Sequence, residues 1–283
     1  MELHTDYPFW LIQNGLGRVY PSLAGDIKDD VVIIGAGITG ALAAYYLTNA
    51  GYGVTVVDKR HVAMGSTAAS TSLLQYEIDV PLRELSKKRG LSDAVKSYQL
   101  CAGAIDKLTA IAHKLKVKSY KSRPSLQFAS YRSHVSPLQQ EFLLRKQHSF
   151  PVSWLSGPAI KEKFGIPAGG GIFSGCGAEA DPYELTHKLL AHATGKGAKV
   201  FDMTEIAEIT NRPRSVLLTT KKGCQITARY AVVATGYESY QYLPKRVDSL
   251  CSTCAIISKP LPEQEFWHKR ALIWEACGDI FVV

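Results

Sequence analysis

The amino-acid sequence predicts an α/β fold with a Rossmann-like, doubly wound parallel sheet, and three features near its start carry this prediction. A continuous apolar run at 30–34 has the composition of a parallel strand buried on both faces. The motif GAGITG follows directly and opens a helical pattern over 38–49. A second apolar run at 53–58 then reads as another buried strand. A strand, a helix and a strand in this order make a doubly wound α/β layout the default.

The glycine motif has the spacing of a dinucleotide-binding turn, Gly-x-Gly-x-x-Gly. Gly35 permits the tight turn, Gly37 lets the backbone approach a pyrophosphate, and Gly40 lets the helix pack closely on the strand. The helix that begins at Ile38 directs its free N–H groups and its dipole toward the phosphates. The motif follows a strand and opens a helix, which is the context that dinucleotide binding requires.

An acidic residue at the end of the second strand supports the same function. Asp58 lies 23 positions after Gly35, where a carboxylate accepts hydrogen bonds from the ribose hydroxyls of an adenosine. Its charge opposes a 2′-phosphate, although Lys59 and Arg60 are adjacent. Spacing alone leaves FAD and NAD open.

Composition and charge exclude several classes of protein. The 283 residues are 46% hydrophobic and 20% charged, which excludes intrinsic disorder and coiled coil for most of the chain. The net charge of +8 is spread thinly, and Lys107, Lys114 and Lys116 on a helix predicted over 91–116 have no aromatic residues interleaved with them, so we expect no nucleic-acid partner. The start lacks a secretory signal, and Val31 to Leu47 reads as strand, turn and helix rather than as a membrane span. We therefore expect a cytoplasmic protein with no integral membrane segment.

The remaining elements alternate between helices and strands. Apolar spacing predicts a long amphipathic helix over 91–116 and helices at 136–148, 157–164 and 182–194, the last capped by Asp181. Strands are predicted at 126–130, 152–155, 197–201, 206–210, 216–220, 225–230 and 231–236, and the last four suggest an antiparallel meander as crossover. The glycine-rich stretches 168–171 and 175–177 are expected to form a flexible connection.

Five motifs in collinear order resemble the D-amino acid oxidase superfamily, which includes glycine oxidase and sarcosine oxidase. They are VVIIGAGITGALAAYYL, VTVVDKR, GSTAASTSLLQYEID, AEADPYELTHKLLAHATGKGAKV and AVVATGYES, spread over residues 30–258. The resemblance implies FAD as cofactor and three domain segments. These are a leader at 1–27 that packs on the body, a discontinuous FAD-binding domain at 28–115 and 179–248, and an inserted mixed-sheet substrate domain at 116–178 and 249–283.

The resemblance also implies which residues bind the cofactor, and it leaves the catalytic side chains unknown. The implied cofactor-binding residues are Gly35, Ala36, Gly37, Ile38, Thr39, Gly40, Asp58, Lys59, Gly65, Ser66, Thr67, Ala69, Ser70, Thr71, Ile206, Thr235 and Gly236. The implied reaction is hydride transfer from a small amine or amino acid to flavin. Oxidation of a hydroxy substrate such as glycerol 3-phosphate shares every motif, and a non-catalytic adenosine-binding fragment is the alternative from another class.

The family's chains continue beyond the position that corresponds to Val283, so the resemblance suggests a C-terminally truncated chain. The continuing part supplies a glycine-rich turn and a helix that faces the flavin ring. We therefore expect residues 1–283 alone to hold FAD weakly and to turn over little amine.

The six cysteines are scattered, and only Cys251 and Cys254 form a CxxC pair. The flanking sequence CSTCAIIS reads as a strand, which directs the two thiols to opposite faces and gives no metal site. We predict that both cysteines are reduced and structural. Replacing both with Ser should leave the zinc content, measured by elemental analysis, and the flavin content unchanged. Stoichiometric zinc in the wild type that is lost in the double variant contradicts this prediction.

Overall fold

The chain folds into two compact units in a computed structural model that describes residues 3–4, 7–243, 253–276 and 281–282. Unit 1 consists of Met1–Thr71 and Asp181–Cys254, and unit 2 consists of Ser72–Ala180 and Ala255–Val283. Residues 72–115, which the sequence analysis assigned to the cofactor domain, belong to unit 2. The reason is that the helices in this segment pack on other elements of unit 2 rather than on the glycine-motif sheet.

Unit 1 contains one six-stranded sheet with the order β10-β11-β12-β1-β2-β9. Strands β12, β1, β2 and β9 are parallel, and β10, β11 and β12 form the predicted antiparallel meander. The two strands predicted at 225–230 and 231–236 are one continuous strand. The bounds are β1 (Ile27–Ile34), β2 (Val54–Val57), β9 (Lys199–Phe201), β10 (Ile206–Arg212), β11 (Ser215–Thr220) and β12 (Gln225–Val233).

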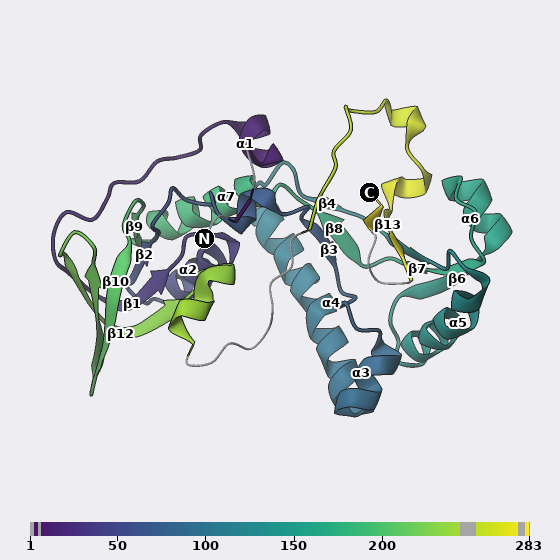
Figure 1. Cartoon of the computed structure of the whole chain (residues 1–283), viewed down its shortest axis with the longest axis horizontal. Coiled ribbons are helices and arrows are strands. Elements are labelled where there is room, and N and C mark those ends of the chain that lie inside the picture. The colour runs from purple at the N-terminus through teal and green to yellow at the C-terminus, as the bar shows by residue number, and fades with distance from the viewer. Residues whose placement is uncertain (1–2, 5–6, 244–252, 277–280, 283) are drawn as a thin grey trace. The chain divides into compact units, whose positions relative to one another are not determined.

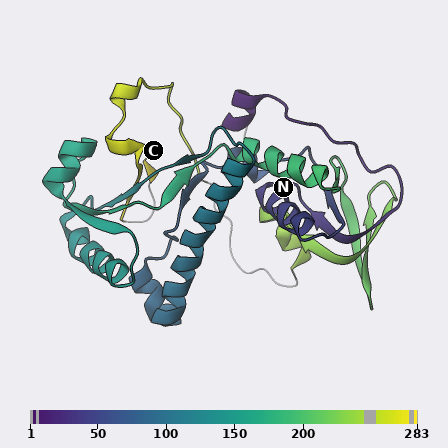
Figure 2. The ribbon, with the colours of Figure 1, turned by 180° about the vertical axis from the view of Figure 1, so that it is seen from behind.

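Helices α2 (Ile38–Asn49) and α7 (Pro182–Gly195) pack against each other and against the parallel strands (Figures 1 and 2). The predicted cap of α7 is confirmed, because Asp181 Oδ1 accepts hydrogen bonds from Tyr183 N at 2.8 Å and Glu184 N at 3.0 Å. The apolar core of this sheet also includes Leu23, Val32, Ile34, Val57, Leu218, Ile226 and Ala228.

The N-terminal segment packs on unit 1. It contains a short helix, α1 (Phe9–Asn14), which the sequence analysis did not predict. The indole Nε1 of Trp10 donates to Ser70 O at 2.7 Å, and Leu23 N donates to Thr204 Oγ1 at 3.0 Å. Leu23 itself is buried. The segment is thus part of the body of unit 1 rather than a loose tail.

Unit 2 contains a five-stranded sheet with the order β14-β13-β5-β7-β6 and a three-stranded sheet with the order β3-β8-β4. Its strands are β3 (Leu73–Gln75), β4 (Lys121–Ser122), β5 (Ser125–Phe128), β6 (Val152–Ser156), β7 (Gly170–Ser174), β8 (Gly177–Glu179), β13 (Leu272–Glu275) and β14 (Phe281–Val282). Its helices are α3 (Leu82–Arg89), α4 (Leu91–Lys114), α5 (Arg132–Gln147) and α6 (Gly157–Phe164). The long helix predicted at 91–116 is therefore confirmed as α4.

Two sequence predictions in unit 2 are wrong. Gly170 and Gly171 open strand β7 and Gly177 opens strand β8, and a Cβ at Gly171 or Gly177 would lie 2.8 Å from a carbonyl oxygen of the neighbouring chain segment. These glycines thus permit close strand packing instead of flexibility. The strand expected around CSTCAIIS does not form over residues 253–258, where Ile256 is fully exposed and pairs with no strand.

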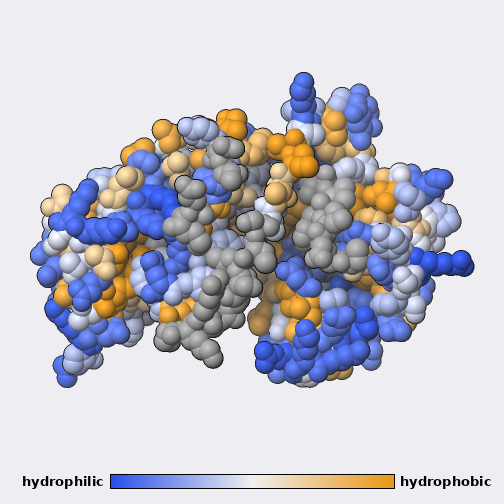
Figure 3. Space-filling view, in the orientation of Figure 1, coloured by the Kyte–Doolittle hydropathy of each residue, from blue (hydrophilic) through white to orange (hydrophobic). Residues whose placement is uncertain are grey.

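The C-terminal end of helix α3 in unit 2 is charged and exposed. Lys87, Lys88 and Arg89 at the end of α3 are exposed, and the surface over α3 at the bottom of Figure 3 is hydrophilic. Within the described part of the chain, no helix is both long and apolar enough to span a membrane.

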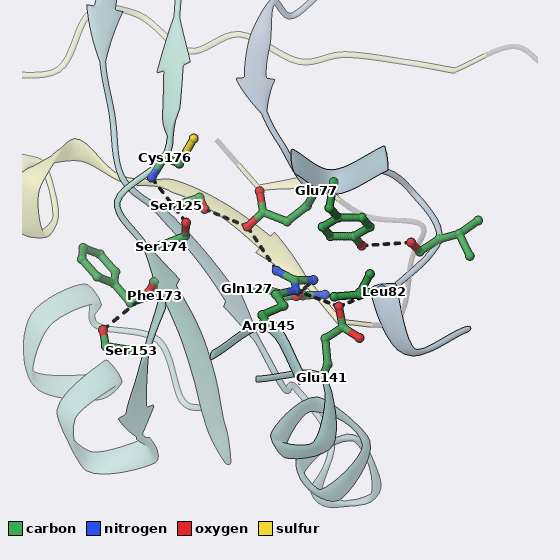
Figure 4. Close-up of polar contacts among 12 residues, drawn as sticks. Glu77, Leu82, Ser125, Gln127, Glu141, Arg145, Ser153, Phe173, Ser174 and Cys176 are labelled. Atoms are coloured by element: carbon green, nitrogen blue, oxygen red, sulfur yellow. Dashed lines mark hydrogen bonds and ion pairs between the residues drawn. The ribbon is translucent and has the colours of Figure 1, made fainter. Parts of the chain in front are cut away.

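A buried ion cluster joins the helices of unit 2 to its sheet. The guanidinium of Arg145 on α5 lies between Glu77 Oε1, at 3.2 Å, and Glu141 Oε1, at 2.7 Å (Figure 4). The two oxygens of Glu141 also accept the N–H groups of Leu82 and Arg83 at 2.9 Å each, which caps the start of α3. Burial raises the pKa of Glu77, and the positive charge of Arg145 opposes this shift. Arg145 is fully buried, so these partners replace its lost water.

We predict that Arg145→Ala destabilises the chain strongly, because it leaves two buried carboxylates without their cation. The expected loss in the free energy of unfolding is about 3–5 kcal/mol, measured by urea denaturation. Arg132→Ala removes an exposed cation from the same helix and serves as the control, with an expected change within about 0.5 kcal/mol. Equal effects of the two substitutions contradict the structural role of the cluster.

Candidate functional site

The site lies in unit 1, at the edge of the sheet where parallel strands β1, β2 and β12 end. Backbone hydrogen bonds hold the three ends together. Gly35 N donates to Val57 O at 2.8 Å, and Ala234 N donates to Ile34 O at 2.8 Å. The turns that follow these strands therefore meet at one edge, which is where open α/β sheets bind their ligands.

The first turn depends on two close backbone contacts. Gly35 has φ +106°, and a Cβ at this position would collide with the carbonyl oxygen of Ala234. A Cβ at Gly40 would collide with the carbonyl oxygen of Gly35. Both roles predicted for these glycines, a tight turn and close helix packing, are thus visible in the backbone.

The approach to the helix start is open beside Gly37. A Cβ there would lie 2.9 Å from Thr67 Oγ1, and apart from its chain neighbours no other described atom lies within 4 Å. Thr67 belongs to the loop at 65–71, here called the Gly-Ser loop. The Oγ1 of Thr67 accepts the N–H of Ile38 at 3.1 Å, so this loop crosses the first turn of α2. The cradle has the open space and the helix N-terminus that a pyrophosphate requires.

Asp58 ties the second turn to the first. Its Oδ2 accepts the N–H of Ala36 at 2.7 Å, and its Oδ1 accepts the N–H of Arg60 at 2.8 Å. Burial raises the pKa of Asp58, and the two backbone hydrogen bonds oppose the shift. Each carboxylate oxygen keeps a further acceptor site, so the group can also accept ribose hydroxyls.

The basic residues after Asp58 are paired with a carboxylate that the sequence analysis did not identify. Lys59 Nζ lies 2.7 Å from Glu238 Oε1, and Arg60 Nη1 lies 2.9 Å from Glu238 Oε2. Glu238 belongs to the 3₁₀ turn that follows β12. The only sequence signal for such a carboxylate was the adjacent pair Lys59 and Arg60, because two cations that become partly buried side by side need an anionic partner.

The Gly-Ser loop, 65–71, contributes only part of its predicted residues to this edge. Its 3₁₀ turn, Ser66–Ala69, begins beside Gly236, where an added Cβ would lie 3.7 Å from Ser66 Oγ. At the other end of the loop, Ser70 and Thr71 are exposed and Ser70 O accepts the indole N–H of Trp10. The first half of the loop therefore lies at the site, and the second half packs on the N-terminal segment.

Thr235 and Ile206 complete the predicted set. Thr235 Oγ1 is buried and has no hydrogen-bond partner among the described residues, so it offers an unused donor at the strand edge. Ile206 opens β10, next to a pocket of about 210 Å³, but does not line it. The pocket is lined by Leu23, Lys59, Met203, Thr204, Glu205, Thr220, Lys221 and Lys222. Thr204 N donates to Asp58 O at 2.7 Å, which places the pocket beside the end of β2.

Metal ligands are absent from the described part of the chain, where no group of three or more His, Cys, Asp or Glu side chains could hold an ion. The four cysteines at positions 101, 176, 224 and 254 form no disulfide, and Cys254 is exposed. Cys251 lies outside the described residues, so the geometry of the CxxC pair stays a prediction.

Comparison with known proteins identifies the family. A family model described as "DAO: FAD dependent oxidoreductase" matches residues 30–283, so the chain belongs to this family of FAD-dependent oxidoreductases. The chain is 24% identical over 224 residues to YhfW of Bacillus subtilis (strain 168), whose name describes a Rieske 2Fe-2S iron-sulfur protein. That alignment covers 78% of this chain and 43% of YhfW.

Solved structures show the same fold. Glycine oxidase from Bacillus cereus superposes with a TM-score of 0.60 at 22% identity, covering 75% of this chain and 56% of that one. L-alpha-glycerophosphate oxidase from Mycoplasma pneumoniae superposes with a TM-score of 0.63 at 15% identity, covering 88% of this chain and 65% of that one. The predicted Rossmann-like FAD fold is thus confirmed. The chain spans about half the length of its curated relative and less than two thirds of these structures.

We predict that Gly37→Val abolishes ADP binding and keeps the fold, because the new side chain fills the cradle beside the start of α2 and displaces only the Thr67 hydroxyl, which lies 2.9 Å from an added Cβ. The measurement is calorimetric titration with ADP, with circular dichroism to check folding. Gly25→Val is the matched control, since a Cβ at Gly25 meets no atom within 4 Å. Unchanged ADP affinity in folded Gly37→Val removes the assignment of this cradle.

Proposed function

We propose that unit 1 binds FAD, and that the protein is an oxidoreductase acting on a small amine or amino acid. The observation that carries the proposal is the meeting of Gly37, Asp58, Thr67 and Thr235 at one edge of a parallel sheet. An open backbone cradle, a carboxylate and an unpaired hydroxyl match the pyrophosphate and ribose of an adenine dinucleotide.

In this proposal the residues of unit 1 bind and orient the adenosine half of the cofactor. The N–H groups of Thr39 and Gly40 at the start of α2 would face the pyrophosphate and favour its negative charge, whereas the N–H of Ile38 donates to Thr67 Oγ1. The carboxylate of Asp58 accepts the ribose hydroxyls while its bonds to Ala36 and Arg60 keep it in place. Lys59 lines the pocket that we assign to the adenine base, and Ile206 follows Glu205, which also lines it.

The flavin, when bound, supplies the acceptor for a hydride from the carbon next to the substrate nitrogen. Because the cofactor carries this chemistry, the proposal needs no acid–base pair, and we assign no catalytic side chain. Substrate binding is assigned to unit 2, whose mixed sheet corresponds to the expected substrate domain. A cytoplasmic location also stays a prediction.

Glycerol 3-phosphate is the second candidate substrate. The similarity in fold to a glycerophosphate oxidase supports it, and the same cofactor site serves either reaction. The two reactions differ in the atom next to the oxidised carbon, which is nitrogen in one and oxygen in the other, so a test with both substrates must decide between them.

We predict that the chain binds FAD weakly in equilibrium dialysis and that small amino acids then bleach the visible flavin absorbance slowly under anaerobic conditions. Gly37→Val, which blocks the cradle, is the control for specific binding. Bleaching by glycerol 3-phosphate but not by amino acids replaces the amine with the hydroxy substrate. Binding of ADP without any binding of FAD supports the adenosine-binding fragment instead. A chain that binds neither nucleotide contradicts the proposed function.

A further inference from the structure

The basic pair beside Asp58 raises a question about which nucleotide the site accepts. Asp58 occupies the position that binds a ribose 2′-hydroxyl, and a cation beside that position is what allows other dinucleotide sites to accept a 2′-phosphate. Lys59 and Arg60 both follow Asp58 directly. Unless they are engaged elsewhere, their two positive charges favour a 2′-phosphate.

Glu238 engages both cations. Its Oε1 lies 2.7 Å from Lys59 Nζ and 3.1 Å from Arg60 Nη2, and its Oε2 lies 2.9 Å from Arg60 Nη1. The side chain of Glu238 is 10% exposed, and those of Lys59 and Arg60 are 30% and 31% exposed. One largely buried carboxylate thus binds the ammonium of Lys59 and two nitrogens of the Arg60 guanidinium.

The backbone fixes Glu238 to the same edge of the sheet as the nucleotide cradle. Glu238 N donates to Thr235 O at 3.1 Å, within the turn that follows β12. Thr235 N in turn lies against Gly35, because an added Cβ there would be 3.3 Å away from it. The position of the Glu238 carboxylate therefore depends on the contact between the glycine turn after β1 and the turn after β12.

The four side chains of this group, Asp58, Lys59, Arg60 and Glu238, carry no net charge when all of them are ionised. Asp58 and Glu238 carry two negative charges, and Lys59 and Arg60 carry two positive ones. Glu205, the other acid near Arg60, is itself paired with Lys221 at 2.9 Å. Lys222 also lines the adjoining pocket, as an exposed side chain. Burial acts to raise the pKa of Glu238, but the hydrogen bonds from Arg60 and Lys59 outweigh it and lower the pKa to about 2. Glu238 is therefore ionised at neutral pH.

We propose that Glu238 is a specificity-determining positioning residue, which holds Lys59 and Arg60 away from the ribose so that the site rejects a 2′-phosphorylated nucleotide. This inference rests on the proposed nucleotide site in unit 1. It assigns the selection to two carboxylates, with Asp58 repelling a 2′-phosphate directly and Glu238 withholding the cations that could bind it.

The test compares two probes that differ only in the 2′-phosphate, AMP and adenosine 2′,5′-bisphosphate. We expect wild-type chain to prefer AMP. Glu238→Gln keeps the shape of the side chain and removes the negative charge that both cations pair with, so the affinity for the bisphosphate relative to AMP should rise about tenfold or more. Glu238→Asp keeps the charge and should restore the preference for AMP. Lys59→Ala and Arg60→Ala together, in the Glu238→Gln background, should remove the gain.

Glu179→Gln is the matched control, because it breaks an ion pair of 2.6 Å with Arg123 in unit 2 and should leave the ratio of affinities unchanged. If Glu238→Gln does not fold, the triple variant Lys59→Ala, Arg60→Ala and Glu238→Gln decides, because it removes the three ion-pair partners together and leaves none of them unpaired. Its affinity for the bisphosphate relative to AMP should match that of the wild type, and a fall of about tenfold in this ratio shows that the cations already contact the 2′-phosphate, which overturns the inference. An unchanged ratio in folded Glu238→Gln also overturns it, while AMP binding keeps the proposed function. Failure of wild-type chain to bind AMP, ADP or FAD overturns both.

Discussion

The hydrogen bonds that the Asp58 carboxylate accepts hold the nucleotide edge of unit 1 together. They join the turn after β2 to the glycine turn after β1, through Ala36 N at 2.7 Å. The glycine turn then touches the turn after β12, where Gly35 leaves no room for a side chain beside Ala234. Burying this carboxylate has a cost, which is visible in its raised pKa. The same burial gives it a fixed position, so that its remaining acceptor sites face a ligand.

Charge compensation governs both units, by different means. In unit 2 the fully buried Arg145 is satisfied by Glu77 and Glu141, so the cluster joins elements of the fold and is closed to ligands. At the edge of unit 1 the pairing of Glu238 with two cations is only partly buried. Such a partly exposed group contributes little to stability, but in the proposed nucleotide site it would decide which charges a ligand meets.

Sequence patterns predicted the elements that carry their own local signal. The glycine motif, the helix over 38–49, the cap at Asp181 and the meander all follow from spacing or from local hydrogen bonding. Strands β7 and β8 were missed, because glycine signals flexibility unless a neighbouring strand is known to approach within contact distance. Glu238 was missed for a similar reason. Its partners lie 178 and 179 positions away, and only the parallel pairing of β12 with β1 brings them together.

Amide hydrogen exchange with and without ADP tests whether a nucleotide binds at this edge of unit 1. The glycine turn at 35–40, the turn at 58–60 and the loop at 65–69 should exchange more slowly when ADP is saturating. Segments of α3 and α5 in unit 2 should exchange at the same rate in both conditions. Protection that is confined to unit 2, or saturating ADP that protects none of the three segments, contradicts a nucleotide site built from Gly37, Asp58 and Thr67.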